Sequence, residues 1–546
     1  MNANEIFEQI LTLRKGDVEA DVFLNPDYQR DLFDPWLMAD MDKAVGRLES
    51  ARAAAEKVTI YGDYDIDGLT ASTIMREAGT AWGLDIDVYI PNRFEEGYGL
   101  NKAAITEIAK TGTTLIVTVD CGSLSVKEVA HAKQLGVDVI VTDHHAVGDV
   151  LPDAVAVLNP QRKDGNYPHT NLAGVGVAFK LIQAAMQKMP GIAKGQEKWM
   201  LDLVALGTVC DVVPLIGENR ALVHWGLIVA RQGKRIGLTA LSQAAGVDVK
   251  TMRAVDMAFK LGPRLNASGR MISAKKSLEL LGSESLAEAR LLASELEAFN
   301  SQRKMEQERI TDEAMVLAIK DDNPVIVLSS PDWSHGIIGI VASKIMHQLR
   351  KPTLLMQEMG DICKGSARSY GDFKLNQAVD EVRDILLSGG GHAFAAGCTV
   401  ALSDFDVLKK RINDYYSSLK LSDQAGVLSP HADVAIDDAD VLNMQLIELL
   451  EKLEPFGEKN PAPIFKITNA RLSDLVMMGS SGKHCRGKII DQQGLKHEFV
   501  HFNNAPELMN KLGKADLFDC FVRLEKNWFR GECKVQRQLI DAVGAN

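Results

Sequence analysis

The sequence lacks the features of a secreted or membrane protein. It contains no apolar run long enough to cross a bilayer. Its start, MNANEIFE, has neither a basic nor an apolar leader region, so we expect no signal peptide. The seven cysteines include no CxxC pair, which argues against a disulfide framework or a zinc knuckle. These absences predict a cytoplasmic protein with reduced thiols and no membrane partner.

The chain also lacks an excess of positive charge. It has 61 Lys and Arg against 73 Asp and Glu, which gives a net charge of −12. Proteins that mainly grip duplex DNA need cations to neutralise phosphates, so this balance argues mildly against that class. A negative metal centre beside locally basic channels would produce the same balance. At 546 residues the chain is long enough for three or four domains.

Short apolar segments alternate with helix-like segments between residues 47 and 235. The predicted strands are VTIYGD, DIDVYIP, TLIVTVDCG, DVIVTDHH and AVAVLNP. This alternation is typical of βαβ units, in which helices cover both faces of a parallel sheet. Ligands of such sheets bind beyond the carboxyl ends of the strands. The N-terminal segment, residues 1–46, shows no such pattern, and Pro26 and Pro35 break any long helix there.

Three further units follow along the chain. Residues 236–320 form a helical connector, whose part from 273 to 320 is rich in Ala, Leu, Glu, Lys and Arg and predicts one long helix. PVIVLSS opens a second α/β domain, residues 321–422. Residues 430–546 alternate apolar and polar positions between turn signals, which predicts a small antiparallel β domain such as a barrel.

Acidic and imidazole side chains gather where the predicted parallel strands end. They are Asp63, Asp65 and Asp67 after the first strand, Asp120 after the third, Asp143, His144 and His145 after the fourth, and Asp211 in ALGTVCDVVPL. If the strands are neighbours, these side chains converge at one edge of the sheet. Carboxylates repel one another, so such a group needs a cation. An oxygen-rich site favours Mn²⁺ or Mg²⁺ over zinc, and two such ions can clamp a phosphodiester for hydrolysis.

Simpler interpretations compete with the metal site. DYDIDG copies the first half of an EF-hand loop, but the twelfth position counted from Asp63 is Ile74, not glutamate. An isolated His-His pair is often only a solvated loop. Cys121 and Cys210 lie beside predicted ligands, but small buried cysteines are the better interpretation, because neighbouring strand residues point to opposite faces.

The motifs DYDIDG, VTVD, TDHH and CDVVP resemble those of the DHH phosphoesterases. In the second half, RLNASGR, WSHGIIGIVASK, GSARS and GGGHAFAAG resemble the associated DHHA1-type domain, and LEPFGEKNPAPIF resembles the entry to an oligonucleotide-binding (OB-like) β domain. Motif order, spacing and the third domain are similar to those of bacterial single-strand-specific 5′→3′ DNA exonucleases. The resemblance implies a parallel-sheet DHH domain and a DHHA1-type α/β domain joined by a long helix, with an OB-like barrel at the end.

The resemblance also implies roles for the metal-site residues. One ion would be held by Asp67, Asp120, His144 and Asp211, and the other by Asp65 and Asp63, with Asp120 shared between them. Tyr61 stands where small-substrate relatives often carry a ligating histidine. Asp143 would orient His144 from behind the site. His145 would lie near the scissile phosphate and stabilise developing charge.

The second domain is expected to grip the substrate. The glycines of GGGHAFAAG, among them Gly390 and Gly391, would let the backbone approach a phosphate, and His392 would assist catalysis. Further residues are expected to hold the 5′-terminal phosphate or the backbone of the strand: Ser366, Arg368, Arg264 or Arg270, and Arg93. A structural salt bridge is the alternative for any one of these arginines.

The resulting hypothesis is a single-strand-specific 5′→3′ DNA exonuclease of recombination and repair, which releases mononucleotides with two Mn²⁺ or Mg²⁺ ions. Its expected partners are a single-strand-binding protein and a helicase, and a monomer would suffice. A narrow cleft between the α/β domains would select unpaired strands, and the β domain would track them. Its aromatic and basic candidates are Phe502, Arg523, Lys526, Trp528 and Arg530. The alternatives are a small-substrate phosphodiesterase or oligoribonuclease of the same superfamily and an inactive, strand-holding scaffold.

Overall fold

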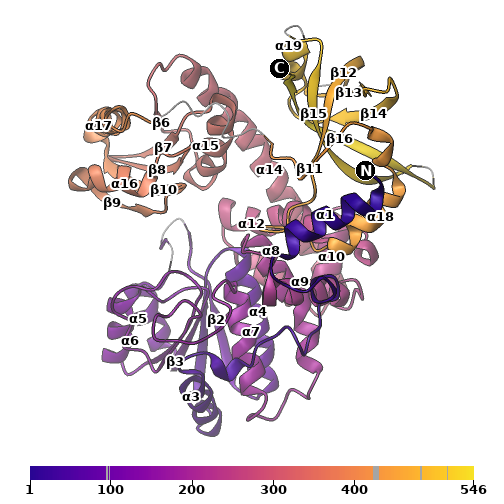
Figure 1. Ribbon diagram of the computed structural model, residues 1–546. Helices are drawn as coiled ribbons and strands as arrows, with labels where there is room; N and C mark the ends of the chain where they lie inside the picture. Colours follow the sequence, from indigo (N-terminus) through magenta and orange to yellow (C-terminus); the bar gives the residue numbers. More distant parts are fainter. Residues whose placement is uncertain are drawn as a thin grey trace.

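The structure is a computed structural model. It describes residues 1–545 except 94, 95, 98, 422–429, 480, 481, 513, 514 and 530. The described chain forms three sheets, one in each of three units, which are coloured purple, salmon and yellow in Figure 1.

The first unit is built on a parallel sheet with strand order β2-β1-β3-β4-β5. Its strands are β1 Lys57–Gly62, β2 Asp85–Tyr89, β3 Thr113–Val119, β4 Asp138–Thr142 and β5 Ala156–Leu158. All five predicted strands are confirmed. Their β-branched residues suit a sheet that is covered on both faces, and the inner strands β1, β3 and β4 are almost entirely buried.

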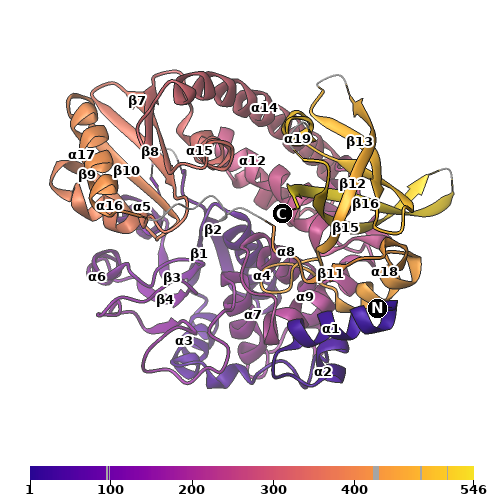
Figure 2. The same ribbon diagram turned by 45° about the horizontal axis from the view of Figure 1, so that its top comes forward.

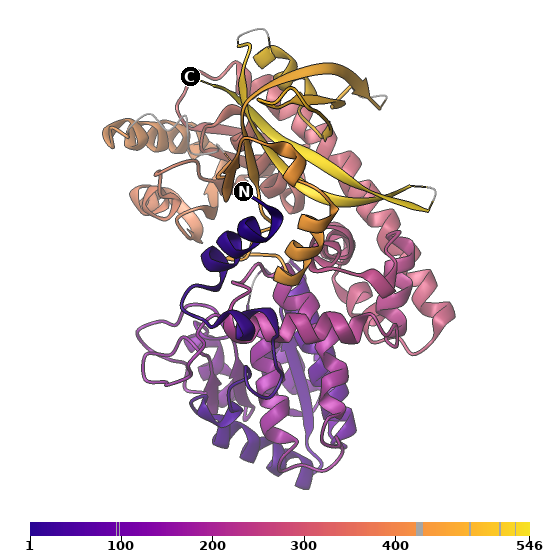
Figure 3. The same cartoon turned by 45° about the vertical axis from the view of Figure 1, so that its right-hand side comes forward.

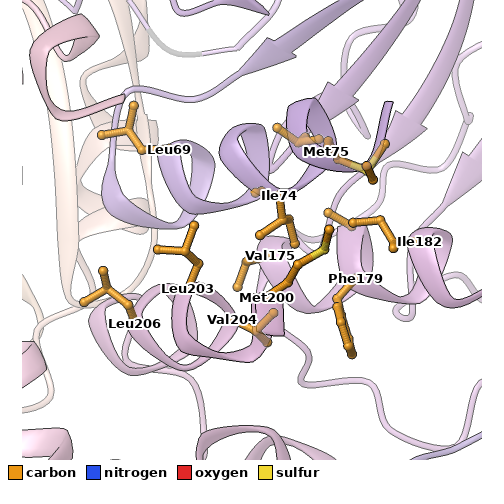
Figure 4. Close-up of a cluster of buried hydrophobic side chains, with 14 of the residues drawn as sticks. Leu69, Ile74, Met75, Val175, Phe179, Ile182, Met200, Leu203, Val204 and Leu206 are labelled. Carbon is orange, nitrogen blue, oxygen red and sulfur yellow. The ribbon is translucent and has the colours of Figure 1, made fainter. Parts of the chain in front are cut away.

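Helices cover both faces of this sheet. They are α3 Met41–Ala53, α4 Ile66–Ala81, α5 Lys102–Lys110, α6 Val126–Gln134 and α7 Gly174–Ala185. Helix α8 Leu201–Cys210 packs on α4 and α7, and α9 Gly217–Ala230 packs on α8. On one face α4 packs against α7 and α8 through Leu69, Ile74, Val175 and Leu203 (Figure 4). On the other face, α5 and α6 bury a smaller core. This packing fixes the loops that follow β1, β3 and β4.

The connector contains a break that the sequence analysis did not predict. Its helices are α10 Ile236–Ala244, α11 Ala254–Asp256, a π-helical turn Met257–Leu261, α12 Gly262–Met271, α13 Lys275–Leu281 and α14 Leu286–Ile319. The single helix expected from 273 to 320 is therefore wrong in its first part. Gly282 ends α13, and the Ser285 side chain caps α14 by accepting from Glu288 N–H at 3.4 Å.

The second α/β unit has a mixed sheet of order β6-β7-β8-β10-β9, in which only β6 and β7 run parallel. Its elements are β6 Ile326–Ser330, α15 His335–Leu349, β7 Thr353–Met359, β8 Ile362–Arg368, α16 Leu375–Glu381, β9 Leu386–Gly391, β10 Ala395–Ala401 and α17 Phe405–Ser418. The glycine-rich motif forms the edge strand β9 and the turn that follows it.

The C-terminal unit is the predicted barrel. Its sheet runs β11-β12-β13-β14-β16-β15, and β12 also pairs with β15, which closes it. The expected antiparallel arrangement is wrong for two pairs, because β11 runs parallel to β12 and β14 runs parallel to β16. Its elements are β11 Val434–Ile436, α18 Met444–Leu450, β12 Phe465–Met478, β13 His484–Ile490, β14 Lys496–His501, α19 Ala505–Leu512, β15 Phe518–Phe529 and β16 Glu532–Gly544.

The first residues join the first and last units. Helix α1 Ala3–Lys15 lies beside α18 (Figure 3), and Ile6, Phe7 and Ile10 are buried in the core of the barrel unit. After α2 Ala20–Leu24 the chain crosses to the first unit. There Arg220 of α9 donates to the carbonyl oxygens of Phe23 and Glu454 at 3.1 and 3.0 Å. The boundary expected at residue 46 falls inside α3.

The three units and α14 follow one another around a ring in Figure 2. Helix α14 contributes to the cores of the first and the second unit. The barrel unit lies beside the connector, where Leu524 and Phe259 line one pocket and Lys483 pairs with Glu308 of α14 at 3.0 Å. Among the described helices, none combines the length and the apolar character that crossing a membrane requires.

Candidate metal centre and substrate site

Three of the predicted acidic residues lie where β1 leads into α4. Asp65 is the N-cap of α4, and its Oδ1 accepts from Gly68 N–H at 3.1 Å. A Cβ at Gly68 would lie 2.5 Å from the Asp63 carbonyl oxygen, so only glycine allows the helix to begin this close to the loop. Asp63 and Asp67 are buried, and Asp65 is partly exposed.

Asp67 is also held by a helix that is distant in the sequence. Its carboxylate accepts hydrogen bonds from Gly174 N–H at 2.6 Å and Val175 N–H at 2.8 Å, both at the start of α7. A helix N-terminus favours a negative charge. These donors were not predicted from the sequence, although the small residues of AGVGVAF are a signal for close approach of the backbone.

Asp120 follows β3 in a conformation that few residues other than glycine adopt. Its φ is +61°, and its side chain is buried. A Cβ at Gly174 would lie 2.6 Å from Asp120 Oδ1, so a glycine there makes room for the carboxylate. The next residue, Cys121, is buried in the core formed with α5 and α6, which confirms that it is a structural cysteine.

The His144 ring lies at the centre of the acidic group. Its Nε2 is 3.1 Å from Asp120 Oδ1, 3.6 Å from Asp211 Oδ2 and 3.8 Å from Asp67 Oδ2. Neighbouring ligands of a six-coordinate Mg²⁺ lie about 3 Å apart, given its bond lengths. Asp211 does not follow a strand: it is the C-cap of α8, so it approaches the site from the helical layer.

All six predicted metal ligands come together. Asp63, Asp65 and Asp120 form one group, and Asp67, His144 and Asp211 form a second, with the ligand atoms within 4.8 Å of one another in each. Asp120 also groups with His144 and His145, so it stands between the two. This arrangement matches two cation positions that share Asp120.

The electrostatics of this group call for a cation. Burial, together with the neighbouring carboxylates, raises the pKa of Asp63 and of Asp120 well above the usual range. The same causes raise the pKa of Asp67 to about 7 and that of Asp211 to about 9. Among the described residues, Asp63 Oδ1 and His144 Nε2 are buried and have no hydrogen-bond partner in suitable geometry. Five carboxylates and an imidazole fit Mn²⁺ or Mg²⁺ better than zinc.

Asp143 holds the ring of His145 rather than that of His144, so this part of the prediction was wrong. Its Oδ1 lies 2.8 Å from His145 Nδ1 and accepts from His144 N–H at 2.7 Å. Burial alone would raise the pKa of Asp143, but the hydrogen bond with His145 lowers it to about 2. Burial alone would lower the pKa of His145, but Asp143 raises it above its ordinary value. The pair therefore orients His145 and favours its cationic form.

The Tyr61 hydroxyl does not contact the acidic group. It forms hydrogen bonds with the loop that carries Arg93. The hydroxyl donates to the Gly99 carbonyl oxygen at 3.1 Å and accepts from Asn101 Nδ2 at 3.2 Å. Asn101 Nδ2 also donates to Glu96 Oε1 at 3.0 Å. These contacts brace the segment after β2 from which the Arg93 guanidinium extends over the Tyr64 ring, 4.9 Å from its centroid.

Three of the predicted arginines gather on the other side of the site. Arg368 donates to Ser366 Oγ at 3.0 Å, and Arg270 donates to the Gly336 carbonyl oxygen at 3.0 Å. Burial, and then the proximity of Arg93, Arg303 and Arg368, lowers the pKa of Arg270 to about 10. None of Arg93, Arg270 and Arg368 forms an ion pair within the described part of the chain. Like charges brought together in this way bind anions.

Two of the predicted substrate residues lie apart from this basic group. Arg264 forms an ion pair with Glu297 of α14 and donates to the Lys260 carbonyl oxygen at 2.6 Å, which is the structural salt bridge that stood as its alternative. His392 is exposed in the turn after β9, where its N–H donates to the Ala395 carbonyl oxygen at 2.8 Å. Its role, and those of Gly390 and Gly391 beside it, remain predictions.

Comparison with known proteins identifies the family. The chain matches the DHH family, N-terminal domain, at residues 57–208, the DHHA1 domain at 322–418 and the RecJ OB domain at 432–541. The single-stranded-DNA-specific exonuclease RecJ of Salmonella typhimurium is 37% identical over 79% of this chain and 78% of its own length. This chain belongs to the RecJ family. The Bacillus subtilis RecJ is 36% identical over 94% of this chain, which spans 64% of that protein.

Solved RecJ structures share the fold. RecJ from Thermus thermophilus in complex with Mn²⁺ has a TM-score of 0.83 and 28% identity, over 100% of this chain and 78% of that one. The Mg²⁺ complex from the same organism has a TM-score of 0.75 and 26% identity, over 100% of this chain and 77% of that one. The ions named for these RecJ proteins are those that the donors of the present site favour.

The raised pKa values of the carboxylates predict two opposite trends with pH: the stability of the metal-free protein falls as pH rises, whereas the stabilisation by bound metal grows. Without it, the folded protein holds protons on Asp67 and Asp211 that the unfolded chain releases near pH 4. Stability should therefore fall as pH rises from about 6 to 9, where the pKa of Asp211 lies. Mn²⁺ needs the deprotonated carboxylates, so its stabilising effect should grow over the same window.

Thermal unfolding at about pH 6, 7.5 and 9, with and without Mn²⁺, measures both trends. Asp211→Asn is the matched control, because it removes the group whose pKa is raised to about 9. The variant should show a smaller loss of stability with pH and a weaker response to Mn²⁺. A metal-free wild type whose unfolding temperature follows the same pH profile as the variant would contradict this electrostatic account.

Proposed function

We propose that the chain is a metal-dependent, single-stranded-DNA-specific exonuclease that degrades the strand 5′→3′ and releases mononucleotides by phosphodiester hydrolysis. The observation that carries the proposal is the meeting of the acidic group with the arginines. A pocket of about 220 Å³ is lined by Ile66 and Cys210, next to the acidic residues, and by Arg270. A phosphate in this region would face cations from both sides.

The residues of the acidic group would hold the ions, and His145 would act on the substrate. Two divalent ions bound there supply Lewis acidity, which lets a water molecule attack a phosphodiester near neutral pH. His145, kept cationic by Asp143, is placed to stabilise the charge that develops on the phosphate. Asp143 would act through His145 as a positioning residue.

Recognition of the 5′ end would come from the second unit. Ser366 and Arg368 lie on β8. Burial, and then the charge of Arg93 from the first unit, lowers the pKa of Arg368. A guanidinium and a hydroxyl suit a terminal phosphate. A terminal phosphate held at a fixed distance from the ions would make each cut release one nucleotide, which is exonuclease action.

Selection of a single strand would involve the barrel unit and the connector. Between them lies a mostly apolar pocket of about 370 Å³, lined by Val212, Phe259, Phe456 and Leu524 among others. Phe259 is 76% exposed and Trp528 is 69% exposed, so both rings are available to stack on unpaired bases.

The other barrel candidates differ in how available they are. Lys526 is paired with Glu451 at 2.7 Å. Arg523 lines the apolar pocket, and its Nε is buried without a hydrogen-bond partner among the described residues. Phe502 is 40% exposed, and Arg530 lies outside the described residues.

Neither alternative function has an observation in its favour. A small-substrate phosphodiesterase needs only the two α/β units, whereas this chain also carries a RecJ OB domain. An inactive scaffold would have lost metal ligands, and the six predicted ones are present and close together. A cytoplasmic location and a monomer stay predictions from the sequence. A role in recombination and repair, and a single-strand-binding protein and a helicase as partners, stay predictions from the resemblance.

Asp120→Ala tests the catalytic site. Loss of the carboxylate shared by both groups should abolish Mn²⁺-dependent release of nucleotides from a single strand. Binding of the strand should persist, because the arginines are untouched. Asp149→Ala, at a fully exposed aspartate of the same unit, is the control and should cut like the wild type. Unchanged cleavage by Asp120→Ala would show that the site is wrongly assigned.

Arg368→Gln tests recognition of the 5′ end. The wild type should prefer a 5′-phosphorylated strand to one with a 5′-hydroxyl, because Arg368 meets the terminal charge. The variant should lose that preference by roughly ten- to a hundredfold in kcat/KM, as expected for a charge-assisted hydrogen bond. Arg411→Gln, which removes a surface arginine paired with Asp384 in the same unit, should keep it. A preference that survives Arg368→Gln would place the 5′ phosphate elsewhere.

A further inference from the structure

The long helix α14 contributes an arginine to the pocket beside the acidic group. The pocket of about 220 Å³ is lined by Arg303 of α14 and Arg270 of α12, together with Ile66 and Cys210. Ile66 lies between Asp65 and Asp67, and Cys210 directly precedes Asp211. One wall of the pocket therefore adjoins the predicted metal ligands, while the other carries two guanidinium groups.

Arg303 is buried and has no acidic partner. Arg303 is only 8% exposed. Its hydrogen bonds go to the neutral amide oxygens of Asn300, at 3.0 and 3.3 Å, and of Gln307, at 2.7 Å. Within the part of the chain that the structure describes, it forms no ion pair. By contrast, Arg309 on the same helix is more exposed and pairs with Glu306 and Glu313.

Burying the guanidinium groups of Arg270 and Arg303 next to each other is energetically unfavourable, because neither forms an ion pair with a carboxylate among the described residues. Burial lowers the pKa of Arg303, and the charge of Arg303 is among the causes that lower the pKa of Arg270. Removing a cation from water is unfavourable unless an opposite charge compensates it. No carboxylate of the described residues forms an ion pair with either guanidinium, so a bound anion would supply the missing direct partner. A planar guanidinium fork matches the geometry of a phosphate.

We propose that Arg303, together with Arg270, binds a phosphodiester group of the single strand in this pocket. The inference rests on the proposed function and extends it: α14 forms part of the substrate site and does not only connect the two α/β units. Arg303 and Arg270 line this pocket, whereas Arg368 is not among its lining residues and instead lies on β8, where it donates to Ser366 Oγ at 3.0 Å. The phosphate at Arg303 is therefore a different one from the terminal phosphate at Arg368.

A purely structural role for Arg303 makes different predictions. In that role its hydrogen bonds to Asn300 and Gln307 would stabilise α14, and its removal would lower the unfolding temperature without changing how salt affects DNA binding. A phosphate contact has the opposite signature. Removing one of two like charges should leave the unfolding temperature of the DNA-free protein unchanged or raise it, while binding loses one ionic contact.

The salt dependence of binding separates the two roles. Affinity for a 5′-phosphorylated oligothymidylate would be measured by fluorescence anisotropy over a range of NaCl concentrations, with the divalent ions removed so that the strand stays intact. In the plot of log affinity against log salt, Arg303→Gln should have a slope smaller by about 0.7, the value for one phosphate of a single strand. Its affinity should fall roughly ten- to a hundredfold at low salt.

Two matched variants complete the experiment. Arg303→Lys keeps the charge and should keep the wild-type slope, although it loses the guanidinium fork. Arg309→Gln removes an arginine of the same helix that already has acidic partners, so its slope and affinity should match the wild type. With Mn²⁺ present, Arg303→Gln should also raise KM for the strand.

An unchanged slope for Arg303→Gln, or a variant that fails to fold, overturns the inference and leaves the structural role. If the wild type binds and degrades the strand while Arg303→Gln behaves like it, only this inference fails. If the wild type neither binds nor degrades single strands, the proposed function fails first and the inference with it.

Discussion

Repulsion between buried carboxylates is the constraint on which the rest of the structure depends. Asp63, Asp67 and Asp120 are buried at one edge of a parallel sheet, where their negative charges have almost no water to screen them. The fold holds them in place with specific supports: glycines at positions 68 and 174 that make room, the N-terminus of α7 and the cap of α4. Without a cation, this arrangement of carboxylates is unfavourable. A bound divalent cation offsets the repulsion and makes the arrangement favourable.

The arginines of the site are also like charges that lie close together, and they need a bound anion as the carboxylates need a bound cation. Arg270 and Arg303 line a pocket beside the acidic edge without ion pairs among the described residues, and the charges of Arg93 and Arg368 also lower the pKa of Arg270. A chain with a net charge of −12 therefore builds a local cationic surface next to a group that takes cations. A phosphodiester satisfies both, because its oxygens can meet the ions on one side and the guanidiniums on the other. Two adjacent groups of opposite charge that one phosphodiester can bind support the proposed nucleic acid substrate more directly than the net charge of the chain does.

The sequence predicts this centre because parallel strands send their carboxyl ends to one edge. Asp120 and His144 were found from strand patterns alone, and the first-unit sheet follows from β-branched runs. Other features depend on distant contacts that no local pattern carries. The donor at Gly174 reaches Asp67 across more than a hundred residues, and α1 is buried only because the barrel lies against it. Arg303 looks like any arginine of a surface helix until the fold buries it. The break before α14 could have been predicted from the sequence, because Gly282 is a typical helix end and Ser285 a typical N-cap. The helix-favouring composition of the whole segment outweighed these two signals in the prediction.

Anomalous diffraction at the manganese edge, from crystals of this protein soaked in Mn²⁺, tests the central claim most directly. The account predicts two peaks within the acidic edge, one among Asp67, His144 and Asp211 and one among Asp63 and Asp65, with Asp120 reaching both. Peaks that lie elsewhere, or an acidic edge that stays free of manganese at saturating concentration, would contradict it.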